Sequence, residues 1–329
     1  MGKWLGRGLQ LFGGFILTMG VLLVIGMIYE AHQSRQDLRD YIPPGKLYEV
    51  DGRNMHLYTT GTGKTTIVFA SGWGTPNPYA DFSPLYEGLR PYAKLAVYDR
   101  FGYGYSDYTD APRDIDTMTR EIHQLLKSAG HRPPFIMVGH SLGSLEVIRY
   151  AEMYPDEVAG IVMIDGGSPN YYCTEEMEMP EWYFDSARAL IKTGVVRALL
   201  HSDEMTSQWV IDPGSVTEPM RKAATISTLK LAYNENMMEE MWNAQNNARR
   251  VLAERTEFSF PLTILTADPE DADDQSMAWR KDQADFAGWS GKGKQVFVPN
   301  ADHGLHNSHP DVVVNEILRM LNIRGDSGI

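Results

Sequence analysis

The chain has 329 residues, of which 43% are hydrophobic and 22% are charged, a composition typical of one large globular domain with additions. Its formal net charge of −13 would repel phosphate backbones, so nucleic acid is not an expected partner. Cys173 is the only cysteine, which excludes an intrachain disulfide, a cysteine-rich zinc site and an iron–sulfur cluster.

The first predicted element is a transmembrane helix at residues 8–29. These 22 residues are uncharged and mostly apolar, and about 20 apolar residues cross the hydrocarbon core of a bilayer. A cleaved signal peptide is the alternative, but the run is long for one and no A-x-A cleavage pattern follows it. Residues 30–45 are polar and end at Pro43-Pro44, which predicts a stalk.

Basic residues flank the apolar run on both sides, with Lys3 and Arg7 before it and Arg35 and Arg39 after it. The positive-inside rule gives only a small preference for a cytoplasmic N-terminus. We therefore expect a single-pass membrane protein whose catalytic domain lies outside the cytoplasm.

Short apolar runs separated by helix-length segments follow the stalk. Residues 46–60 alternate around Asp51-Gly52, which predicts an antiparallel hairpin. This alternation of strands and helices is typical of a mostly parallel, doubly wound α/β sheet. The predicted buried strands are residues 65–70, 94–98, 134–138, 158–164, 261–267 and 294–298.

A candidate nucleophile follows the strand at 134–138. The segment Gly139-His140-Ser141-Leu142-Gly143 fits G-x-S-x-G at a junction between a strand and a helix. Such a turn holds the serine in a strained conformation above the sheet, and the helix that begins there directs its positive end at the site. Ser141 is therefore the predicted nucleophile.

The stretch between residues 165 and 261 contains no convincing strand and predicts an inserted helical lid at residues 168–258. Methionine side chains adapt to varied apolar ligands, and their concentration in this insert hints at a pliable binding wall. The methionines are Met177, Met179, Met205, Met220, Met237, Met238 and Met241.

A serine nucleophile needs a base, and His303 follows the last predicted strand. His306 and His309 are alternatives that lie further from the strand end, with His309 expected at the entry to the helix that Pro310 begins. His140, inside the turn, is expected to pack under it.

These segments together resemble the α/β-hydrolase-fold serine hydrolases over residues 46–323. The segment YDRFGYGYSD at 98–107 is similar to the family's D-R-x-G-x-G-x-S turn, VGHSLG to its nucleophile turn and NADHG to its histidine segment. The resemblance implies a core at 46–167 and 259–323. It also implies an oxyanion hole formed by the backbone amides of Trp73 and Leu142.

The acid of the implied triad is ambiguous. Most family members carry it after the strand at 261–267, where Asp268 and Asp271 are the candidates among several acids without a clean match. Some lipases of this fold place it one strand earlier, where Asp165 stands. We favour Asp165, with Asp268 and Asp271 as alternatives. A structural carboxylate is the other interpretation of Asp165.

The sequence thus predicts a membrane-anchored serine hydrolase that cleaves a carboxylic ester through an acyl-enzyme, with no metal or organic cofactor. A lipid or a medium-chain acyl ester is the expected substrate class. A serine aminopeptidase or carbon–carbon bond hydrolase on the same fold is the alternative enzyme. A catalytically silent ligand-binding receptor is the alternative from another class, and the oligomeric state is left open.

Overall fold

The computed structural model describes residues 2–174, 179–212, 214–270 and 274–322. The chain forms two compact units. Met1–Ile42 and Met179–Val210 make up one of them, here called the helical unit. Pro43–Glu178 and Ile211–Ile329 make up the other, here called the core unit.

The core unit is built on an eight-stranded sheet with the strand order β1-β2-β4-β3-β5-β6-β7-β8. β2 pairs antiparallel with β1 and β4, and all other neighbouring strands are parallel. The predicted α/β-hydrolase fold is therefore confirmed. The strands are β1 Lys46–Val50, β2 Arg53–Thr60, β3 Thr66–Ala70, β4 Lys94–Tyr98, β5 Phe135–His140, β6 Val158–Ile164, β7 Leu262–Asp268 and β8 Gly293–Pro299.

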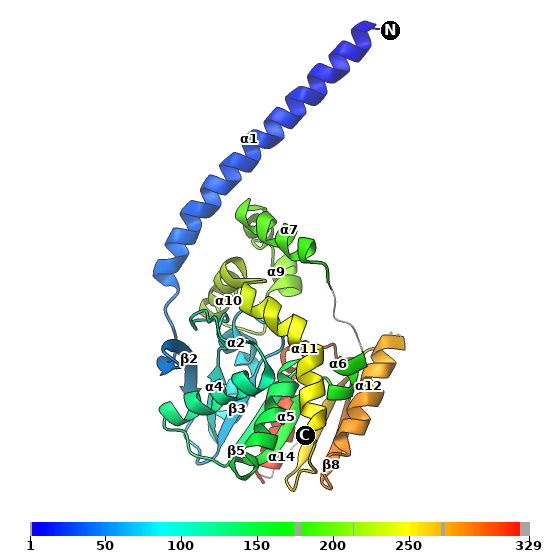
Figure 1. The fold of residues 1–329 in the computed structure, drawn as a ribbon. Coiled ribbons are helices and arrows are strands. Elements are labelled where there is room, and N and C mark those ends of the chain that lie inside the picture. The colour runs from blue at the N-terminus through cyan, green and yellow to red at the C-terminus, as the bar shows by residue number, and fades with distance from the viewer. Residues whose placement is uncertain (1, 175–178, 213, 271–273, 323–329) are drawn as a thin grey trace. The chain divides into compact units, whose positions relative to one another are not determined.

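Successive side chains of each central strand pack alternately into two hydrophobic cores, one on each face of the sheet. Val68 of β3 packs in one buried cluster, whereas Ile67 and Phe69 pack in the other, because successive strand residues point to opposite faces. Helices α4, α5 and α11 cover the first face and α14 covers the second (Figure 1). A sheet buried on both faces explains why its strands are continuous apolar runs.

The predicted hairpin joins β1 and β2 through Asp51 and Gly52, both with positive φ (49° and 78°), as a tight two-residue turn requires. The helices of the core unit range from single turns to α11, the longest among the described residues of this unit. They are α2 Pro78–Asp81, the 3-10 helix Ser83–Leu85, α3 Tyr86–Leu89, α4 Ile115–Ser128, α5 Gly143–Met153, the 3-10 helix Pro155–Glu157, α6 Pro169–Thr174, α10 Glu218–Leu231, α11 Glu235–Ala253, α12 Asp274–Ala287, α13 Leu305–Ser308 and α14 Pro310–Met320.

The helical unit consists of α1 (Gly2–Asp40), α7 (Glu181–Lys192), α8 (Val195–Leu199) and α9 (Asp203–Trp209). α1 contains a stretch long and apolar enough to cross a membrane. The predicted stalk is helical as far as Asp40, because it contains neither glycine nor proline before Pro43.

The predicted lid does not form one unit. Residues 179–210 belong with α1, whereas α6, α10 and α11 belong to the core unit. Buried ion pairs lie within each unit: Arg197 of α8 bonds to Glu30 of α1, while Glu240 of α11 lies beside Arg100 and Arg113 of the core unit.

Candidate active site

Ser141 lies at the sharp turn between β5 and α5. Its φ of 51° is in the left-handed region, which residues other than glycine rarely adopt. The flanking glycines allow the close packing of this turn. A Cβ at Gly143 would lie 2.5 Å from the carbonyl oxygen of Ser71 and 2.7 Å from that of Ala70, at the end of β3. The strain and the tight packing together present the Ser141 side chain at the carboxyl edge of the sheet.

Asp165 and His303 are brought together at the same edge. Asp165 follows β6, the neighbour of the nucleophile strand, and His303 lies in the loop after β8. Nδ1 of His303 lies 2.7 Å from Oδ2 of Asp165. The Asp165 side chain is only 5% exposed, whereas that of His303 is 52% exposed. A buried carboxylate therefore orients a solvent-accessible imidazole.

The other oxygen of Asp165 accepts hydrogen bonds from the core. The donors to Oδ1 are the Ala267 amide at 3.2 Å, Trp279 Nε1 at 3.1 Å and Gln283 Nε2 at 3.1 Å. Burial alone would raise the pKa of Asp165, but the bond to His303 and these donors hold that pKa below the usual value of an aspartate. The carboxyl group is therefore ionised at neutral pH.

The alternative acids lie elsewhere. Asp268, at the end of β7, forms an ion pair with Arg280 at 2.7 Å. Asp271 lies outside the described residues. Asp165 is thus the candidate acid that the structure joins to His303.

The alternative histidines have other partners. His306 is buried, with its Nε2 3.0 Å from Oδ2 of Asp81, and His309 precedes α14 as its N-cap residue. His140 is buried under the turn, and its Nε2 lies 3.1 Å from the carbonyl oxygen of His303. His140 therefore donates a hydrogen bond that supports the loop carrying His303.

Residues 71–73 form the predicted oxyanion loop, which packs directly on the nucleophile. A Cβ at Gly72 would lie 3.1 Å from Cβ of Ser141. Arg100 donates to the carbonyl oxygen of Gly72 at 2.8 Å and to that of Ser71 at 3.2 Å. Because the C=O and N–H of one peptide unit point in opposite directions, fixing the Gly72 carbonyl also fixes the direction of the Trp73 N–H.

The second predicted oxyanion donor is the amide of Leu142, the N-cap residue of α5. Among the hydrogen bonds of the described residues, none uses this amide as a donor. An N–H at the start of a helix, left without an internal acceptor, is available to a negatively charged oxygen.

Arg100 is part of a buried charged cluster, defined here as Arg100, Arg113, Glu121, Glu146 and Glu240. Arg113 pairs with both oxygens of Glu121 at 2.9 Å, and Arg100 pairs closely with Glu146 of α5. Glu240 of α11 is held more loosely, 3.4 Å from Arg100 and 3.8 Å from Arg113. The cluster joins the oxyanion loop, the nucleophile helix and α11.

Sequence reasoning missed several residues of the site. Tyr172 is buried close to Ser141, and burial raises the pKa of its hydroxyl, which therefore stays protonated. Trp279 and Gln283 support Asp165 from α12. Their spacing of four residues places them on one helix face, which was the only available signal.

Asp81, His140 and His306 form the group of described residues whose ligand atoms could hold a metal ion, since these atoms all lie within 4.8 Å of one another. His306 and Asp81 are already joined by a hydrogen bond of 3.0 Å, and Nε2 of His140 faces the His303 carbonyl. We interpret the group as support beneath the nucleophile turn.

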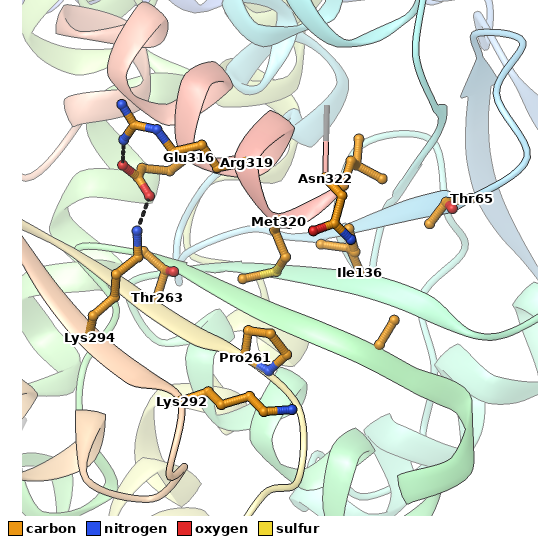
Figure 2. A pocket seen from close by; sticks show the side chains of 12 residues that line it. Thr65, Ile136, Pro261, Thr263, Lys292, Lys294, Glu316, Arg319, Met320 and Asn322 are labelled. Atoms are coloured by element: carbon orange, nitrogen blue, oxygen red, sulfur yellow. Dashed lines mark hydrogen bonds and ion pairs between the residues drawn. The ribbon is translucent and has the colours of Figure 1, made fainter. Parts of the chain in front are cut away.

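A cavity of about 430 Å³ lies at the opposite edge of the sheet, near the amino ends of the strands (Figure 2). Thr65, Ile136 and Pro261 line it where β3, β5 and β7 begin. Its Glu316 pairs with Lys294 at 2.5 Å and also with Arg319. The strand direction separates this cavity from Ser141, and in open α/β sheets ligands bind at the carboxyl edge.

Comparisons with known proteins agree with this fold. The model of the alpha/beta hydrolase family matches residues 67–316. The protein YbdG of Bacillus subtilis (strain 168) is 28% identical over 279 residues, which cover 83% of this chain and 85% of YbdG. The pimeloyl-[acyl-carrier protein] methyl ester esterase of Shewanella woodyi is 32% identical over 127 residues, 39% of this chain and 45% of the esterase.

Among solved structures, an epoxide hydrolase from Bacillus megaterium superposes with a TM-score of 0.62 at 17% identity. The match covers 84% of this chain and all of the epoxide hydrolase (100%). At that identity the likeness concerns the fold alone.

Proposed function

This chain belongs to the alpha/beta hydrolase family, and on that premise we propose that it is a serine hydrolase that cleaves a carboxylic ester through an acyl-enzyme. Ser141 is the nucleophile, His303 the general base and Asp165 the acid of the triad. The observation that carries the proposal is the bond of 2.7 Å between the buried Asp165 and the exposed His303, at the sheet edge where the strained Ser141 lies.

The proposed reaction has two halves. Nε2 of His303 removes the proton of Ser141 as the hydroxyl attacks the carbonyl carbon, and the amides of Trp73 and Leu142 stabilise the resulting oxyanion. Asp165 holds the imidazole in the tautomer that accepts this proton. The protonated His303 then gives the proton to the leaving alcohol, and water attacks the acyl-enzyme by the same route.

Ser141 also argues against epoxide hydrolysis, despite the structural likeness. Epoxide hydrolases of this fold attack with a carboxylate, and this chain has a hydroxyl at that position. The Shewanella esterase supports an ester substrate. A lipid or a medium-chain acyl ester is the proposed substrate class, and α1 is proposed to anchor the protein in a membrane with the core unit outside the cytoplasm.

A fluorophosphonate probe tests the proposal, because it reacts with activated serines. Wild-type protein and Ser144→Ala should be labelled, whereas Ser141→Ala should not. Ser144 is a matched control, since its buried hydroxyl donates to the Gly167 carbonyl at 2.6 Å. Failure to label well-folded wild-type protein would favour a ligand-binding receptor. A series of p-nitrophenyl esters and aminoacyl amides would then separate esterase from aminopeptidase activity.

A further inference from the structure

The contact between α1 and the insertion 181–209 lies partly within the apolar run of α1. A Cβ at Gly26 would clash with the carbonyl oxygen of Thr193, and one at Gly194 would lie 2.8 Å from the carbonyl oxygen of Gly26. Gly194 has a φ of 79° at the turn between α7 and α8. Two glycines thus allow the two backbones to touch, as small residues do between helices in membranes.

Buried ion pairs continue this contact toward the C-terminal end of α1. The guanidinium of Arg197 donates to both carboxylate oxygens of Glu30 at 2.6 and 2.7 Å, and it lies 2.8 Å from Asp37. Gly26, Glu30 and Asp37 project within about 40° of one another around α1, because each residue turns the helix by about 100°. One face of α1 is therefore dedicated to the insertion.

The position of the contact along α1 fixes its depth. The uncharged run ends at Tyr29, so Gly26 lies three residues inside it. At about 1.5 Å per residue this is about 5 Å, the depth at which interfacial helices lie in a bilayer. If α1 crosses a membrane, the turn between α7 and α8 must therefore lie at the boundary between headgroups and acyl chains.

The insertion exposes apolar side chains of the kind found at the boundary between headgroups and acyl chains. Large apolar side chains are exposed along all three helices, including Trp182 (67%), Leu190 (44%) and Trp209 (48%). Tryptophan and tyrosine are the side chains that favour the membrane interface. Acidic residues accompany the basic ones, with Asp185 paired to Arg188, so no basic face selects anionic lipids.

We propose that the insertion 181–209 is a membrane-surface element that binds the interfacial layer of the bilayer through its exposed apolar side chains. The contacts at Gly26 and Arg197, here called the clamp, hold this element against α1. The proposal rests on the proposed anchoring role of α1 and is independent of the proposed chemistry at Ser141. Its partner is the lipid surface itself, and zwitterionic lipids suffice.

Quenching of a fluorescent label by lipids tests the proposal in the full chain. In a Cys173→Ser background, a single cysteine at position 190 (Leu190→Cys) is labelled with an environment-sensitive fluorophore. The protein is then placed in phosphatidylcholine vesicles with and without doxyl-labelled phosphatidylcholine. Leu17→Cys reports on α1, and Tyr92→Cys, exposed on the core unit, is the control. The labels at positions 17 and 190 should be quenched, and the label at position 92 should not.

The outcomes separate the two proposals. Quenching at position 17 with none at 190 would overturn the membrane-surface element and leave the anchor intact. No quenching at either position would overturn the anchor and the surface element together, while fluorophosphonate labelling of Ser141 would still test the chemistry. A requirement for anionic lipid would overturn the predicted partner.

A pair of glycine substitutions tests the clamp. Gly26→Leu should reduce quenching at position 190 by about twofold or more, because the new side chain separates α1 from the turn at Gly194. Gly20→Leu is the matched control on the same helix, since a Cβ there meets nothing within 4 Å. Equal quenching in the two variants would overturn the clamp.

Discussion

Asp165 is the proposed acid of the triad, and its Oδ2 lies 2.7 Å from Nδ1 of His303. Ser141 and His303 stand in local patterns, so a short stretch of sequence identifies each. The acid is defined only by which strand tip reaches the imidazole across the sheet. That contact joins residues 138 positions apart, and no local pattern encodes it.

We predict that Asp165→Asn lowers kcat by about 10⁴ while the protein stays folded, because asparagine keeps the shape but not the charge that holds His303 in the required tautomer. Asp268→Asn is the matched control. It removes a carboxylate that pairs with Arg280 instead, so its effect on kcat should be small. Steady-state kinetics with an activated ester measures both.

If Asp268→Asn lowered kcat strongly and Asp165→Asn did not, the acid of the triad would be Asp268, at the end of β7. Near-normal turnover in both would exclude a triad that depends on a carboxylate at either position.

Among the elements, the strands were predictable to within one or two residues, because each is a buried apolar run. The division of the lid was not predictable, because it involves contacts between residues far apart in the sequence. Arg197 and Glu240 both lie in the predicted lid, yet one pairs with α1 and the other with the core unit. Periodicity identifies helices but does not identify these partners.

The buried charged cluster gives a prediction about how these elements are held together. Its three carboxylates face two guanidinium groups, and burial raises the pKa of the loosely held Glu240, although Arg100 and Arg113 act to lower it. Glu240→Gln leaves the Arg100–Glu146 and Arg113–Glu121 pairs intact. It should therefore lower the unfolding free energy by about 1 kcal/mol or less. Arg100→Gln leaves carboxylates unpaired in the core and should cost about 3–5 kcal/mol.

Urea denaturation of the two variants measures the difference. Glu240→Gln keeps an acceptor for the Tyr103 hydroxyl, which donates to Glu240 at 2.7 Å in the native protein. If Glu240→Gln were as destabilising as Arg100→Gln, Glu240 would be a required partner and not the surplus carboxylate.

For the molecule as a whole, the fold class was predictable and the grouping of its parts was not. A mostly parallel α/β sheet follows from the spacing of apolar runs, and a few turn motifs carry the resemblance to the α/β-hydrolase fold. That an N-terminal helix and residues 179–210 form one unit depends on contacts across more than half of the chain.

His140 should contribute to the dependence of the unfolding free energy on pH. Burial, together with the charges of His306 and His303, lowers the pKa of His140 to about 3. Between pH of about 6.5 and about 3 the unfolded chain binds a proton that the folded protein does not, so the stability is lost as the pH falls through this window. The contribution of His140 alone to this loss should be about 2 kcal/mol between pH 7 and 5.

His140→Gln isolates this contribution, because it removes the titrating group. The comparison with wild type is needed, since burial raises the pKa of Glu152 to about 7 and thereby opposes the effect of His140. The variant should lose about 2 kcal/mol less than wild type between pH 7 and 5 in denaturation experiments. An identical loss would mean that His140 titrates normally in the folded protein.

The contact between α1 and the turn at Gly194 also bears on how this chain could have diverged. An ordinary anchor is selected only for its hydropathy, so almost any apolar sequence can replace it. Here a small residue at position 26 and acids at 30 and 37 would be inherited as a set with the arginine at 197. In relatives that lack the insertion, none of these positions would be constrained by the contact. The sequence of their first helix would then vary among apolar residues.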